Sequence, residues 1–125
     1  MKRRCLFPLA ILANASMLAL CLLSRHDIFP VVFLLPLFHG PLFALNLKAA
    51  RRWWQVILLG LEHIAATVLT VIFDAWICRR YFGYDPADLV SSAIALEAGF
   101  AIAVILFVIH IAVFARRQKR QRAVT

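Results

Sequence analysis

Long apolar segments alternate with short polar stretches along the whole chain. Four such segments stand out, at residues 5–23, 28–47, 53–78 and 89–115. A helix needs roughly 20 predominantly apolar residues to cross a bilayer, so each segment is long enough to span. None shows the alternation of apolar and polar residues that a transmembrane β-strand requires. The pattern predicts an all-α integral membrane protein, a compact bundle of four transmembrane helices in a single domain of residues 1–125.

The stretches between the segments are short, at residues 24–27, 48–52 and 79–88. Consecutive helices joined by such short connections are expected to be antiparallel neighbours. Residues 116–125 follow the last segment as a basic tail.

Composition supports the membrane interpretation and excludes several classes of protein. Of 125 residues, 64% are hydrophobic and 16% charged, whereas soluble domains are usually about 45–50% apolar. A soluble enzyme, a disordered chain and a disulfide-stapled secreted module are thereby excluded. The sequence contains no CxxC or HExxH motif and no phosphate-binding loop, so neither a metal site nor an enzyme is expected.

The placement of the basic residues predicts the orientation. The first segment's N-terminal flank, the 48–52 connection and the tail lie on one side and carry eleven of the fourteen Lys and Arg residues, while Arg25, Arg79 and Arg80 lie on the other. The positive-inside rule then predicts that both termini are cytoplasmic, in a multi-pass protein of the cell membrane, with the bacterial inner membrane favoured. The tail lacks interleaved aromatic residues, so it is expected to contact anionic lipid and not nucleic acid.

The first segment has a second interpretation, as a cleaved signal peptide. A charged start precedes it, and Ala13-Asn14-Ala15 resembles a small-residue cleavage site. The apolar run continues to residue 23, however, which is typical of a full membrane span. A retained first helix is therefore favoured.

Polar residues inside the apolar segments are the candidates for function. At 100° per residue, His63, Thr67, Thr70 and Asp74 fall within about 40° of one another on a helix. A polar stripe of this kind is expected to face other helices or water, because exposure to lipid is costly.

Polar residues in all four segments are expected to lie at a similar depth in the membrane. Counted at 1.5 Å per residue from the nearer end of each segment, five residues lie about 12–15 Å inside the membrane; they are Asn14, His39, Glu62, His63 and Glu97. This layer contains two carboxyl groups, and with Asp74 it forms a candidate site for protons, cations or a substrate. The alternative is a hydrogen-bonded clamp that fixes the order of the helices.

The fourth segment also carries a ladder of small residues at intervals of four: Ser91, Ala95, Gly99 and Ala103. Small residues allow transmembrane helices to approach closely. The ladder is expected either to pack inside the bundle or to form a homodimer contact.

Three functions are compatible with these features. The first is a small proton- or cation-coupled transporter or efflux protein that uses the carboxyl groups of the layer. The second is a non-catalytic accessory subunit or toxin-immunity-type protein, which acts through helix contacts as a homodimer or in a larger membrane complex. The third is a haem-binding subunit, because His39 and His63 lie at similar depth. No other cofactor is indicated.

Overall fold

The computed structural model describes residues 5–23, 29–81 and 86–124, apart from some side chains. The elements are α1 (Leu6–Ala15), η2 (Ser16–Leu23), α2 (Phe29–Ala49), α3 (Trp53–Tyr81) and α4 (Pro86–Val124). These described ranges contain no strand, which confirms the all-helical prediction for them. The short 3₁₀ helix η2 continues α1, so the two together cover the first apolar segment.

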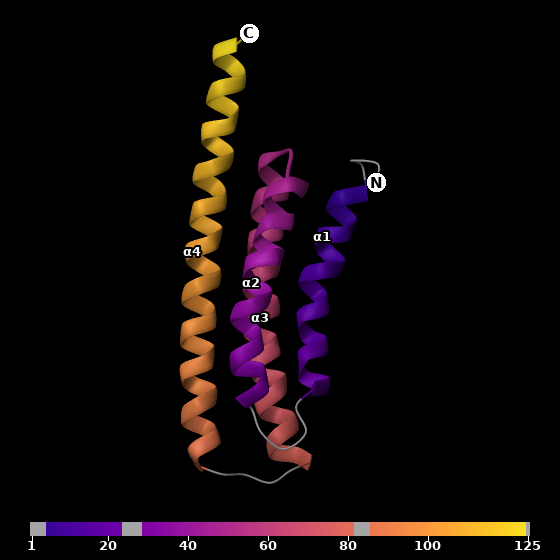
Figure 1. Ribbon diagram of the computed structural model, residues 1–125, viewed down its shortest axis with the longest axis vertical. Coiled ribbons are helices and arrows are strands. Elements are labelled where there is room, and N and C mark those ends of the chain that lie inside the picture. The colour runs from indigo at the N-terminus through magenta and orange to yellow at the C-terminus, as the bar shows by residue number, and fades with distance from the viewer. Residues whose placement is uncertain (1–4, 24–28, 82–85, 125) are drawn as a thin grey trace.

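The helices run side by side along one long axis (Figure 1). Helices α2 and α3 occupy the middle, with α1 on one side and α4 on the other. Helix α1 contacts both α2 and α3, and α4 also contacts both of them. Helix α4 extends beyond its neighbours at the C-terminal end, so most of the segment expected as a basic tail continues the helix.

Two helices in the described part of the chain are long and apolar enough to cross a membrane. One is α3, with 29 residues and a mean hydropathy of 2.2 over its most apolar stretch. The other is the Ser92–Val124 part of α4, with 33 residues and a mean hydropathy of 2.7. Both lengths exceed the roughly 20 residues that one crossing needs. The apolar stretch Leu6–Ala19 is shorter.

Two clusters of buried apolar residues hold the bundle together. One lies around Met17, Leu42, Ala66, Val71 and Ala95. The other contains Ala10, Ala49, Ala50, Val56, Leu59 and Phe114. Each cluster combines residues of α3 and α4 with residues that precede α3 in the chain, so both clusters join helices that are far apart in sequence.

The small-residue ladder of α4 packs inside the bundle. Ala95 and Ala103 are buried, as is Gly99, while the side chain of Ser91 lies outside the described residues. On the facing helix, a Cβ added to Gly60 would collide with the ring of Phe107. Helices α3 and α4 therefore approach closely, and the contact within one chain accounts for the ladder.

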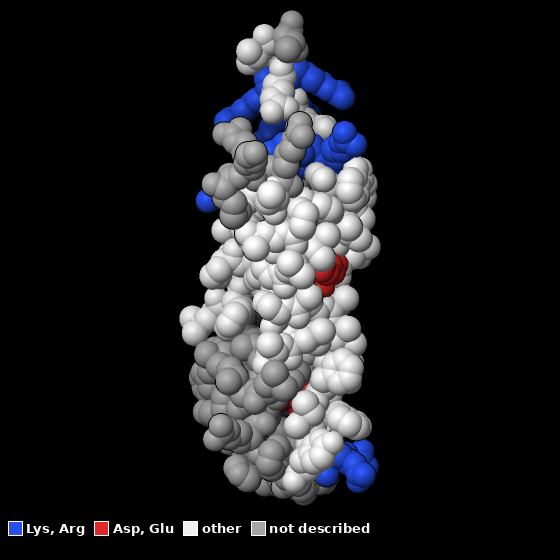
Figure 2. All heavy atoms as spheres, turned by 90° about the vertical axis from the view of Figure 1, so that its right-hand side faces the viewer, with Lys and Arg blue, Asp and Glu red and all other residues white. Residues whose placement is uncertain are grey.

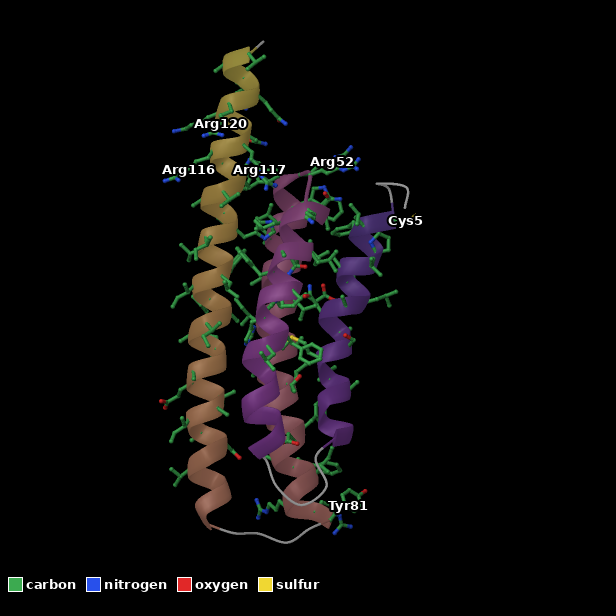
Figure 3. All side chains as sticks on the ribbon, viewed as in Figure 1. Cys5, Arg52, Tyr81, Arg116, Arg117 and Arg120 are labelled. Carbon is green, nitrogen blue, oxygen red and sulfur yellow. The ribbon has the colours of Figure 1, made fainter. Side chains whose placement is uncertain are left out.

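The basic residues gather at the ends of the bundle. On the face drawn in Figure 2, Lys and Arg side chains lie at the two ends and the middle is almost uncharged. Nη1 of Arg117 donates a 3.0 Å hydrogen bond to the carbonyl oxygen of Leu47. Nε1 of Trp53 donates one of 3.0 Å to Oε1 of Gln118. These bonds hold the basic end of α4 against the connection between α2 and α3, at the end opposite Tyr81 (Figure 3).

Candidate functional site

Two histidines meet at the centre of the candidate site. His39 on α2 and His63 on α3 are 3% and 4% exposed. Nδ1 of His39 lies 2.7 Å from Nε2 of His63, and the rings stack with their centroids 4.9 Å apart and their planes at 22°. One nitrogen of this bond must carry a hydrogen and the other a lone pair. The hydrogen bond therefore forms when both imidazoles are neutral and also when one of them is protonated. It is lost when both are protonated, because no nitrogen then has a lone pair.

Asn14 links three helices on the side of the site nearer the basic end. Its amide exchanges two hydrogen bonds with that of Asn46, of 3.2 and 3.3 Å. Nδ2 of Asn14 also lies 3.4 Å from Oε2 of Glu62. Asn14 and Asn46 are buried, whereas Glu62 is half-buried. The carboxyl group of Glu62 thus joins the site through α1.

Asn46 was missing from the residues that the sequence singled out. Its position near the end of the second apolar segment gave it no obvious depth match. It follows His39 by seven residues, however, and seven residues are close to two helical turns. The shared face of His39 and Asn46 is the signal that could have found it.

The polar stripe predicted on α3 is buried along its length. Thr67, Thr70 and Asp74 are each 0% exposed. The hydroxyl of Thr67 donates to the carbonyl oxygen of His63 at 2.8 Å, and that of Thr70 donates to the carbonyl oxygen of Ala66 at 2.6 Å. Both hydroxyl groups therefore donate to the backbone of α3, one turn before their own residue.

Together these residues form a polar track through the bundle. We use this name for Asn14, Asn46, Glu62, His39, His63, Thr67, Thr70 and Asp74. From Glu62 to Asp74 the track rises by about 18 Å, at 1.5 Å per residue. It carries a carboxyl group near each end and two imidazoles between them, so groups that bind and release protons recur along a path lined by apolar helices.

Glu97 is not brought to the track. Its side chain is exposed, and it lies about 160° around α4 from Ala95, which is buried. The contact of Gly60 with Phe107, together with the antiparallel course of the helices, places Glu97 near the level of Thr70. It is therefore about two turns from Glu62 along the bundle and on the opposite side of α4. The two carboxyl groups of the predicted layer therefore lie apart within one chain.

His110 is a further buried imidazole, on α4. It is 2% exposed and packs edge-to-face on Phe43, with ring centroids 6.3 Å apart and planes at 87°. Its Nε2 has no hydrogen-bond partner among the described residues, and neither does Nε2 of His39. These two buried ring nitrogens are the ones to which the described residues offer no partner.

The histidine pair does not fit a haem. An iron ligated by both rings would stand between the two ligating nitrogens, with the macrocycle between the rings. Here the nitrogens touch at 2.7 Å and the rings stack on each other, which leaves no space for the cofactor. Within the described ranges no group of three or more His, Cys, Asp or Glu residues has the arrangement of a metal site.

Comparison with known proteins adds no relative. No family model, no curated protein and no solved structure matches the chain.

Proposed function

We propose that this chain is a multi-pass membrane protein that moves protons or small cations along the polar track. In this proposal all four apolar segments cross the bilayer and both termini face the cytoplasm. Glu62 receives the proton or cation on the cytoplasmic side of the track, and Asp74 does so near the outer end. When the cargo is a proton, the histidine pair transfers it between them.

The outer surface of the bundle supports the placement in a membrane. Large apolar side chains are exposed along its length, among them Leu12 at 67%, Leu37 at 68% and Ile94 at 60%. Soluble monomers rarely expose apolar patches of more than a few hundred Å². Lipid is the environment in which such a surface is stable, and the charged ends then lie at the two interfaces. The end with most of the basic residues is cytoplasmic by the positive-inside rule.

The observation that carries the transport proposal is the burial of titratable groups in a line. A helix that only anchors a protein needs no polar residue, and polar residues inside a membrane mark ion or proton pathways. His39 and His63 share a hydrogen bond of 2.7 Å, a distance across which a proton can pass from one ring nitrogen to the other. Carboxyl groups bind protons and cations alike, whereas the hydrogen bond between the two imidazoles relays protons only.

The test is flux in proteoliposomes that carry a pH-sensitive dye inside. Proton uptake is measured after a membrane potential is imposed, with wild type beside Glu62→Gln and Glu97→Gln. The first variant removes a titrating group from the track and is expected to slow uptake about tenfold or more. The second makes the same chemical change on the far side of α4 and is expected to keep wild-type flux.

Each other outcome has a defined meaning. Wild-type liposomes that take up no protons and no alkali cations contradict the proposal. Equal loss in both variants contradicts a pathway confined to the polar track, because Glu97 does not belong to it. Full activity of Glu62→Gln would show that the polar track has a structural role only. The second candidate function, a non-catalytic membrane partner that acts through its helix surfaces, is then favoured.

A further inference from the structure

The face of α4 that points away from the other helices carries one carboxyl group among small and branched apolar residues. Ala93, Glu97 and Ala101 follow one another at intervals of four and are exposed. Ile94 and Val108, on the same side, are 60% and 59% exposed. At 100° per residue this stripe lies opposite the buried ladder of Ala95, Gly99 and Ala103.

Glu97 is out of place on a surface that faces lipid. It stands near the level of Thr70, close to the middle of α3 and hence deep in the apolar part of the bundle. Within the described part of the chain, no hydrogen bond to its carboxyl group is formed. A carboxyl group at this depth is costly when it meets only lipid, and such residues almost always face another helix or a water-filled cavity.

We propose that the Ala93–Glu97–Ala101 face of α4 binds a second copy of this chain, so that the two Glu97 carboxyl groups meet. In a two-fold dimer whose axis is perpendicular to the membrane, each residue and its copy lie at the same depth, and residues close to the axis contact their own copies. In their protonated form, two carboxyl groups each offer one O–H donor and one C=O acceptor and are self-complementary. A second copy therefore supplies the missing partner at the right depth, whereas an unrelated chain would have to place a polar group there.

The residues next to Glu97 favour the close approach that this bond requires. Ala93 and Ala101 lie one turn before and one turn after it and keep the backbones close, as in small-residue interfaces between transmembrane helices. Ile94 and Val108 supply branched side chains that pack on either side of the crossing.

The basic ends of the two copies do not oppose this arrangement. Helices that cross at small residues often do so at about 40°. The residues from 116 onward begin about 28 Å or more from the crossing, at 1.5 Å per residue. At that angle the two ends stand about 20 Å apart, which is roughly twice the Debye length at physiological salt. The ends also lie outside the hydrocarbon, where water and counterions screen them.

The experiment measures dimerisation in liposomes by energy transfer between chains labelled at the C-terminus. Dilution with lipid gives an apparent dissociation constant for each protein. Glu97→Gln keeps a donor and an acceptor and is expected to dimerise within a few-fold of wild type. Glu97→Leu and Ala101→Phe are expected to weaken the dimer about tenfold or more, because one loses the hydrogen bonds and the other blocks close approach.

Ala44→Phe on α2 is the matched control, since Ala44 is also exposed but lies on another helix; it is expected to leave the dissociation constant unchanged. Circular dichroism of each variant establishes that it folds. A wild-type chain that stays monomeric at all lipid ratios overturns the proposal, as does unchanged dimerisation of Ala101→Phe. If Glu97→Leu dimerises with the same dissociation constant as wild type, the two carboxyl groups do not bind each other and the proposal is wrong. If a second protein copurifies in stoichiometric amount, that protein and not a second copy of this chain occupies the face. The readout needs no proton gradient, so its failure is distinct from failure of the transport proposal.

Discussion

The rings of His39 and His63 stack in the interior of the bundle, with Nδ1 of the first 2.7 Å from Nε2 of the second. This contact ties α2 to α3 through a single hydrogen bond between side chains that are both almost fully buried. Its strength depends on both partners, because either ring alone would leave a polar nitrogen without a partner in an apolar interior.

Replacing one histidine is therefore expected to lower the free energy of unfolding by more than half as much as replacing both. His63→Leu strands Nδ1 of His39, and we expect a loss of about 1–3 kcal/mol in the free energy of unfolding. The double variant His39→Leu/His63→Leu removes both polar rings and is expected to be more stable than the sum of the single variants predicts, by about 0.5–3 kcal/mol. Unfolding by SDS titration from mild detergent, followed by circular dichroism, measures all four proteins. Strict additivity contradicts the pairing.

Asn14 is expected to be the more important member of the asparagine pair. It bonds to both Asn46 and Glu62, so Asn14→Leu leaves two partners unsatisfied, whereas Asn46→Leu leaves one. We expect Asn14→Leu to lower the free energy of unfolding by about 1–3 kcal/mol and Asn46→Leu by less. Ser16→Ala, at an exposed site, serves as the control and is expected to change stability by less than about 0.5 kcal/mol. The same SDS titration decides the order, and a larger effect at Asn46 would be evidence against it.

Replacement by alanine is expected to destabilise the bundle at one glycine and to have little effect on its stability at another. A Cβ at Gly60 meets the ring of Phe107, while a Cβ at Gly40 meets nothing within 4 Å. Gly60→Ala is expected to push α4 away from α3 and to cost about 1–3 kcal/mol. At Gly40 the better helix propensity of alanine is offset by contact of its Cβ with Pro41, the next residue, so we expect Gly40→Ala to change the stability by less than about 1 kcal/mol. Thermal denaturation in detergent compares the two, and similar midpoints would show that the close approach at Gly60 is absent.

Asp74 is expected to be essential to flux if the polar track conducts. It is fully buried at the opposite end of the track from Glu62, so a proton or cation that follows the track must pass it. Asp74→Asn keeps the size of the side chain and removes its titration, and we expect proton uptake to fall about tenfold or more. Uptake is measured in the same dye-filled liposomes, and the circular dichroism spectrum checks that the variant is folded. Wild-type uptake by a folded Asp74→Asn protein would place the pathway elsewhere.

The proposed orientation is tested by reporters fused after Thr125. Alkaline phosphatase, which is active only outside the cytoplasm, is expected to be inactive there, and green fluorescent protein is expected to fluoresce. Both follow from the basic end of α4, which lies beside the 48–52 connection through Arg117 and Leu47 and which the positive-inside rule assigns to the cytoplasm. The reverse pair of results would require either an inverted bundle or an odd number of spans.

Helical periodicity is enough to predict which residues share a face of one helix. His63, Thr67, Thr70 and Asp74 fall on one stripe because 100° per residue fixes their directions relative to one another, and all four are buried. The same periodicity already separated Ala95 from Glu97 by about 160°, so the ladder and the carboxyl group were never able to face the same neighbour. Helical structure and apolar character likewise followed from segment length and composition.

The rotation and shift of the helices against one another depend on how they pack and could not be read from the pattern. Depths counted from the ends of the apolar segments assume that these ends are level, but the packing of Gly60 on Phe107 sets Glu97 near Thr70 and away from Glu62. Periodicity within one helix cannot specify a shift along its axis, because that shift depends on which side chains of two helices interlock. For the same reason the pairing of Asn14 with Asn46, and the choice to bury the small-residue ladder and leave Glu97 outside, became visible only in the packed bundle.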